Sequence, residues 1–238
     1  MVNGKMHIAM NKYLSLLLIV IWFVACHPNH DLGTPFQEGQ EVILTASIGE
    51  QQQQMLPGMQ RVSGKDATDQ IDLTWDEGDN ILVTVGDKSS VFTLTTGAGT
   101  PQGTFKGTMP ADGDSYSVQY PTTTPNLSEQ QYVPNGFGKD LMLMTTKTNG
   151  TLDGGFTLSA DYALLGLQLT GNTAIGKIVL SKNNAAGTAG DLSYTLLCPT
   201  VTLTAAPTLF YIVVLPGTWA NGFTVKVYKP VYSGTNVV

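Results

Sequence analysis

Histidine is almost absent from this chain. The three histidines are His7, His27 and His30, so residues 31–238 contain none. This absence excludes Ser-His-Asp and Cys-His catalysis in most of the chain, together with any histidine-based zinc site there. His27 and His30 could bind a metal together, but two ligands on a loose segment make a poor site. We therefore expect no metal.

Cysteine is scarce as well, with Cys26 and Cys198 as the two examples. If Cys26 carries a lipid on its sulfur, no intramolecular disulfide can form. Cys198 lies in the strand-like stretch Tyr-Thr-Leu-Leu-Cys-Pro, and we expect it to be an inert core residue. The alternative is a catalytic thiol, which would need a base close by.

Positive charge is the next shortage. The chain has 12 lysines and arginines against 18 acids, and Arg61 is its single arginine. Removal of residues 1–25 would take away Lys5 and Lys12. The remaining chain would have 10 basic and 18 acidic residues, a net charge of 10 − 18 = −8. This charge opposes binding to nucleic acid and to an anionic bilayer surface. We expect no nucleic-acid partner.

No apolar run is long enough to cross a membrane. Residues 13–25 form an uncharged, largely apolar run of 13 residues, whereas a spanning helix needs about 20. The preceding lysines and the small Ala25 favour a cleaved export signal. The end of this run, Phe-Val-Ala-Cys26, resembles the bacterial lipobox, although Phe23 stands where leucine is usual. We predict a signal peptide over 1–25, lipid attachment at Cys26 and a flexible tether over 26–40. An ordinary signal with an incidental cysteine is the alternative.

Beyond the tether the chain lacks any sustained helical period. Short stretches of alternating apolar residues are instead bounded by Gly, Pro, Asn or Asp, which indicates strands. We predict an all-β fold of two consecutive β-sandwich domains, 41–150 and 151–238. Residues 49–70 are predicted to form a mobile loop and 121–138 a long connection. The predicted strands are 41–48, 71–75, 81–85, 91–95, 104–109, 116–120, 141–145, 156–158, 164–170, 175–181, 192–197, 201–204, 209–215 and 223–228.

Three segments carry a family resemblance. They are Thr-Trp-Asp-Glu-Gly-Asp-Asn-Ile at 74–81, the "F-x-G … Y-x-x-x-Y-P" pair within 103–121, and the "LPG" turn with its following strand within 211–227. Together with the lipobox they resemble the fimbrillin-like lipoproteins of the Bacteroidetes, the subunits of protease-assembled pili. The resemblance implies transthyretin-like sandwiches and a surface-exposed, structural role.

The resemblance also implies a mechanism. A precursor is exported as a lipoprotein, anchored in the outer membrane and cut after an arginine in an early loop, which removes its first strand. The vacated groove then takes a strand from the next subunit. Arg61 lies after the predicted strand 41–48 and is the candidate processing site. Implied partners are other pilus subunits or a second copy, and a host or bacterial surface ligand.

The end of the chain departs from this pattern. Ten residues follow the predicted strand 223–228, where the family usually continues with further strands. The sequence leaves open a truncated product or a subunit that cannot donate a strand.

Aromatic residues on strands offer a second function. Trp75, Trp219, Tyr116 and Tyr120 could form a platform for sugars, which would make the chain a glycan-binding surface lipoprotein. Core packing of these rings is the interpretation we favour.

An acidic turn suggests a third possible function, in metal binding or catalysis. Asp76, Glu77 and Asp79 could hold calcium, but they lack the spacing of a dedicated loop. Asp76 and Asp79 could serve a glycosidase as a carboxylate pair. We expect a solvated turn instead. No nucleophile motif or phosphate loop is present, so we predict no enzyme and no cofactor.

Overall fold

The computed structural model describes residues 36–49, 73–113, 115–146, 155–233 and 236–237. Within these residues the regular structure is β, apart from the short 3-10 turn η1 (Lys139–Leu141). The predicted all-β class is confirmed. No described segment forms a helix of the length and apolarity that a membrane crossing requires.

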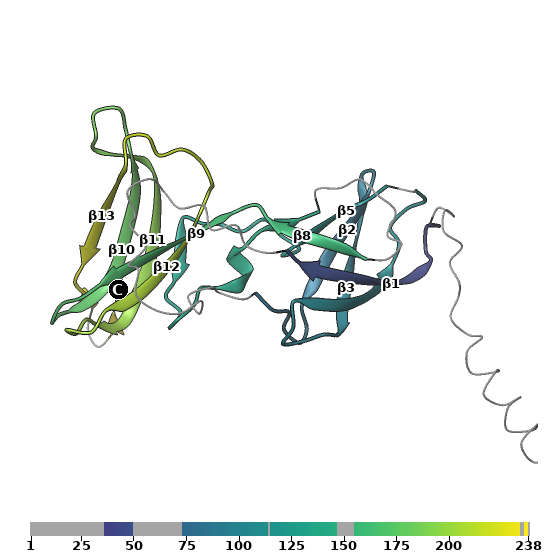
Figure 1. Ribbon diagram of the computed structural model, residues 1–238, viewed down its shortest axis with the longest axis horizontal. Coiled ribbons are helices and arrows are strands. Elements are labelled where there is room, and N and C mark those ends of the chain that lie inside the picture. The colour runs from purple at the N-terminus through teal and green to yellow at the C-terminus, as the bar shows by residue number, and fades with distance from the viewer. Residues whose placement is uncertain (1–35, 50–72, 114, 147–154, 234–235, 238) are drawn as a thin grey trace, which may run out of the picture. The chain divides into compact units, whose positions relative to one another are not determined.

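The first part of the fold is a closed barrel. Its strands run in the order β1-β4-β3-β2-β5-β7-β8, and pairing between β1 and β8 closes the ring. Figure 1 shows β1, β3 and β8 in this barrel. The strands are β1 (Glu41–Ile48), β2 (Asn80–Val85), β3 (Lys88–Thr96), β4 (Gln102–Thr108), β5 (Ser117–Tyr120), β7 (Met144–Thr145) and β8 (Phe156–Ala160). The prediction of two sandwich domains is therefore not confirmed.

Aromatic rings fill the barrel. Trp75 packs edge-on against Phe105 at 4.9 Å and against Tyr120 at 5.4 Å between ring centroids. All three side chains are buried. Such edge-to-face pairs stabilise a core beyond the area that they bury. Trp75 is a core anchor of the barrel, as the sequence predicted.

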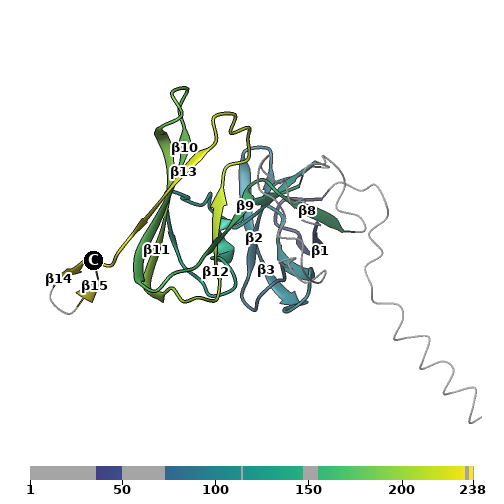
Figure 2. The same cartoon turned by 60° about the vertical axis from the view of Figure 1, so that its left-hand side comes forward.

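The second part consists of three further sheets. One has the strand order β13-β10-β11-β6, another pairs β12 with β9, and the third pairs β14 with β15. Figure 2 shows β10, β11 and β13 together, with the small hairpin β14–β15 near the C-terminus. The strands are β6 (Glu129–Gln131), β9 (Ala163–Leu169), β10 (Ala174–Asn183), β11 (Ala189–Thr202), β12 (Thr208–Val214), β13 (Phe223–Tyr228), β14 (Tyr232–Ser233) and β15 (Asn236–Val237).

Side chains connect the four-stranded sheet with the sheet formed by β12 and β9. The Tyr194 hydroxyl, from β11, accepts a hydrogen bond from the backbone N–H of Leu215, just after β12, at 3.0 Å. The Tyr194 ring also stacks on Trp219, with 6.4 Å between centroids. Leu180, Phe210 and Ile212 are buried in the same region. The two sheets therefore share an apolar core, and the hydrogen bond between Leu215 and Tyr194 lies at the margin of that core.

Two strands pair across the predicted boundary at residue 150. β8 follows that point in the sequence but belongs to the barrel, and β6 precedes it but pairs with β11. The predicted strand 71–75 is wrong in its described part, because residues 73–75 form no ladder. Trp75 is held there by backbone hydrogen bonds with Thr100 and Gly99.

Candidate functional site

β1 lies between two strands that are distant from it in sequence. It pairs antiparallel with β4 from Glu41↔Thr108 to Ser47↔Gln102, and parallel with β8 from Ala46↔Phe156 to Ile48↔Leu158. Just beyond its end, the Gly49 N–H donates to the Leu158 carbonyl at 2.8 Å. β1 is thus an interior strand that closes the barrel.

The sequence of β1 explains this position. Val42, Leu44 and Ala46 are buried in the barrel, whereas Ile43 points outward with 68 % of its surface exposed. This alternation is what a strand with one buried face requires. Full burial of a valine or leucine side chain contributes about 1.5–3 kcal/mol. Without β1, the barrel would expose an apolar groove and two unpaired strand edges.

The acidic turn before β2 is exposed at Asp76 and Glu77, as the sequence predicted, but not at Asp79. Asp79 is 7 % exposed, and its Oδ2 accepts a hydrogen bond from the Asp76 N–H at 2.7 Å. Its other carboxylate oxygen, Oδ1, accepts from Lys139 Nζ at 2.8 Å. Lys139 also reaches Asp76 Oδ2 at 2.8 Å. One lysine therefore balances both carboxylates that we had considered as a glycosidase pair.

Tyr120 completes this cluster. Its hydroxyl donates a long hydrogen bond of 3.4 Å to Asp79 Oδ1. Burial, and then the nearby charge of Asp79, raise the pKa of Tyr120 well above its usual range. For Lys139, partial burial opposes the change, but hydrogen bonds to Asp76 and Asp79 raise its pKa overall. Tyr120 therefore stays protonated and Lys139 stays charged at neutral pH, which is the pattern of a structural cluster.

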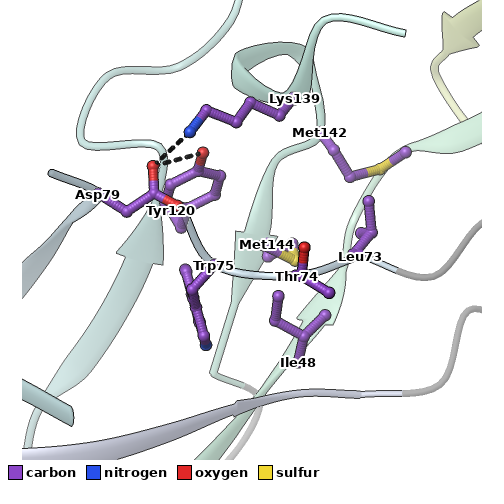
Figure 3. A pocket seen from close by; sticks show the side chains of 9 residues that line it. All are labelled: Ile48, Leu73, Thr74, Trp75, Asp79, Tyr120, Lys139, Met142 and Met144. Carbon is purple, nitrogen blue, oxygen red and sulfur yellow. Dashed lines mark hydrogen bonds and ion pairs between the residues drawn. The ribbon is translucent and has the colours of Figure 1, made fainter. Parts of the chain in front are cut away.

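A small pocket adjoins the cluster and has room for about one water molecule. Figure 3 shows the indole nitrogen of Trp75 at the end of the ring away from Asp79 and Tyr120. This nitrogen is buried and has no hydrogen-bond partner among the described residues. The lining is mainly apolar, and a space this small would not hold an organic substrate. It consists of Ile48, Leu73, Thr74, Trp75, Asp79, Tyr120, Lys139, Met142 and Met144.

The aromatic residues proposed as a sugar platform face inward. Trp75, Trp219, Tyr116 and Tyr120 are all buried. Tyr116 packs edge-on against Phe156 with 6.4 Å between centroids, and Trp219 stacks on Tyr194. These four rings cannot together offer an exposed surface to a glycan.

Cys198 is enclosed in β11. It is buried, and burial raises the pKa of its thiol to about 12. A thiol is a nucleophile only as the thiolate, so this cysteine is poorly suited to catalysis. Its burial agrees with the core role that the sequence predicted.

Gln130 is a polar contact that sequence reasoning missed. Its side chain, from β6, is buried. Nε2 donates to the Val213 carbonyl at 2.7 Å and to the Leu127 carbonyl at 3.0 Å, and Oε1 accepts from the Val213 N–H at 2.9 Å. The side-chain amide thus pairs with β12 as a neighbouring peptide group would. A glutamine in a polar run gives no apolar period by which it could be found.

Several predicted site residues lie outside the described residues. They are the lipid-attachment candidate Cys26, the processing candidate Arg61, and the histidines His27 and His30 that were considered as metal ligands. Among the described residues, no three His, Cys, Asp or Glu side chains come together as metal ligands would.

Comparisons with protein-family models, with curated proteins and with solved structures gave no match.

Proposed function

We propose that this chain is a structural lipoprotein of the cell surface, a fimbrillin-like pilus subunit or adhesin that assembles by β-strand addition. One observation carries the proposal: β1 is the first described strand, it closes the barrel, and it is paired on both sides. A strand in this position can be replaced only by another strand, because its removal exposes apolar side chains and strand edges together.

In this proposal, export and anchoring come first. Cys26 carries the lipid and holds the subunit in the outer membrane, and the barrel and the following sheets are the two β-domains of the subunit type. A protease then cuts after Arg61, which separates β1 from the rest of the chain. A strand from another subunit, or from a second copy, enters between β4 and β8.

The electrostatics are consistent with such a role. The acids near the barrel end are balanced by Lys139, and the Cys198 thiol is buried and held in its protonated form by a raised pKa. The two reactive groups that sequence analysis considered for catalysis are thus committed to structure. The partners are other protein strands and a surface ligand.

The test is cleavage of the purified full chain with an arginine-specific protease. We expect the band to shorten at Arg61 and oligomers to form over time, seen by size-exclusion chromatography and by gel electrophoresis without boiling. Arg61→Lys is the matched control, because it keeps the positive charge and removes the site. A cleaved chain that stays monomeric would contradict the proposal.

A further inference from the structure

The residues of β4 that face the barrel interior differ strongly in size. Gly103, Phe105 and Gly107 point into the barrel, and they lie opposite Ala46, Leu44 and Val42 respectively. Neither glycine leaves an open space beside Phe105, because a Cβ added at Gly107 would lie 2.5 Å from Phe92 Cγ. The β1 residues that pack there also differ in size.

The space near Gly103 is already filled. A Cβ added at Gly103 would lie 2.6 Å from Leu94 Cδ1 and 2.8 Å from Trp75 Cδ1. Ala46, which pairs with Gly103, has 0 % of its surface exposed. The Trp75 and Leu94 side chains therefore cover Gly103, the residue that pairs with the fully buried Ala46.

The neighbouring inward positions accept larger side chains. Val42 and Leu44 are buried without being small, and Ile48 lines the pocket beside Trp75. The outward face sets weaker limits: Glu41 forms an exposed ion pair with Lys106 at 2.9 Å, and Ile43 is exposed. The inward residues of β1 thus follow the order large, large, small, large.

We infer that the slot of β1, between β4 and β8, selects an entering strand by size, with a small residue required where Ala46 now lies. This rests on the proposed function, since it describes which strands the slot would take. The partner is an extended segment of another chain whose alternate residues are large, large, small, large. A shift by two residues would place a large side chain at the fully buried position of Ala46, and such overpacking is destabilising. A shift by one would turn the apolar residues outward.

The experiment uses the full chain, cleaved at Arg61, and a fluorescent peptide with the sequence of residues 41–48 and a soluble tail. Entry of the peptide in mild urea is followed by fluorescence polarisation, and unlabelled peptides compete with it. The A46L peptide tests the small position. The E41L peptide is its matched control, because it adds the same leucine on the exposed face.

We expect the unchanged and E41L peptides to compete equally, and the A46L peptide to need at least about tenfold more. Equal competition by A46L would overturn the size rule while strand entry stands. If no peptide enters, the unchanged one included, strand replacement itself fails, and the proposed function and this inference fall together. Mass spectrometry confirms complete cleavage beforehand.

Discussion

β1 and β6 both lie beside strands that are distant in sequence, but they are held in different ways. β1 pairs on both sides and is fixed by buried apolar side chains. β6 has three residues, pairs with β11 and reaches β12 through one buried amide, that of Gln130. Apolar packing depends on size and shape, so another strand can supply it. The contact of Gln130 depends on one particular side chain. Under the proposed function, β1 is the strand that is exchanged, whereas β6 stays in place.

The largest effect is expected in β1. Leu44→Ala should lower the free energy of unfolding by about 3 kcal/mol, because it leaves a cavity against Phe105. Denaturant unfolding followed by tryptophan fluorescence measures it. Ile43→Ala is the control on the same strand, and we expect a change within about 0.5 kcal/mol there, because Ile43 is largely exposed. Equal losses in both variants would mean that β1 does not fill a core.

The next effect is expected in β6. Gln130→Leu keeps most of the side-chain volume but leaves the N–H and carbonyl of Val213 without the amide. Buried groups that lose their partner cost about 1–3 kcal/mol, and we expect a loss of about 2 kcal/mol. Gln131→Leu, on the exposed side of β6, is the matched control and should be nearly neutral. If both variants unfold alike, the amide contact contributes little.

The contrast also explains what the sequence could predict. Apolar alternation placed β1 at residues 41–48, and the structure has the same bounds. β6 was missed and Asp79 was expected to be solvated, since in both places the buried side chain is polar and held by hydrogen bonds. The alternation of apolar residues does not reveal a buried polar side chain whose hydrogen-bond partners come from elsewhere in the fold.

The predicted and observed folds differ in two further respects, the length of β11 and the closure of the barrel. β11 was predicted as two strands because Pro199 interrupts it, yet β11 continues past this residue, and its pairing with β10 shifts register between Ile175 and Lys177. Closure of the barrel depends on the parallel pairing of β1 with β8. Alternation shows that a strand has a buried face, but it does not identify the partner strand.

The reactivity of Cys198 can be used to measure how firmly β6 is held. Leu197, its neighbour, pairs with Gln131 of β6, so the thiol lies next to the contact between β6 and β11. Because burial raises its pKa to about 12, its thiolate fraction at pH 8 is about a thousandfold below that of a free cysteine. With Cys26→Ser, Cys198 is the single thiol of the chain. We expect very slow reaction with a disulfide reagent in the folded protein and rapid reaction in urea.

The rate of that reaction distinguishes the two strands more finely than unfolding does. If the Gln130 amide keeps β6 in place, the loss of about 2 kcal/mol in Gln130→Leu should speed labelling of Cys198 about thirtyfold, because 1.4 kcal/mol in an opening equilibrium is a factor of ten. Gln131→Leu should leave the rate unchanged. The measurement is made at low denaturant, where global unfolding is rare, so that it reports opening near β6. A rate that is equal in the two variants would show that β6 is held by its backbone pairing with β11. The contrast between a strand held by apolar packing and a strand held by one side-chain amide would then disappear.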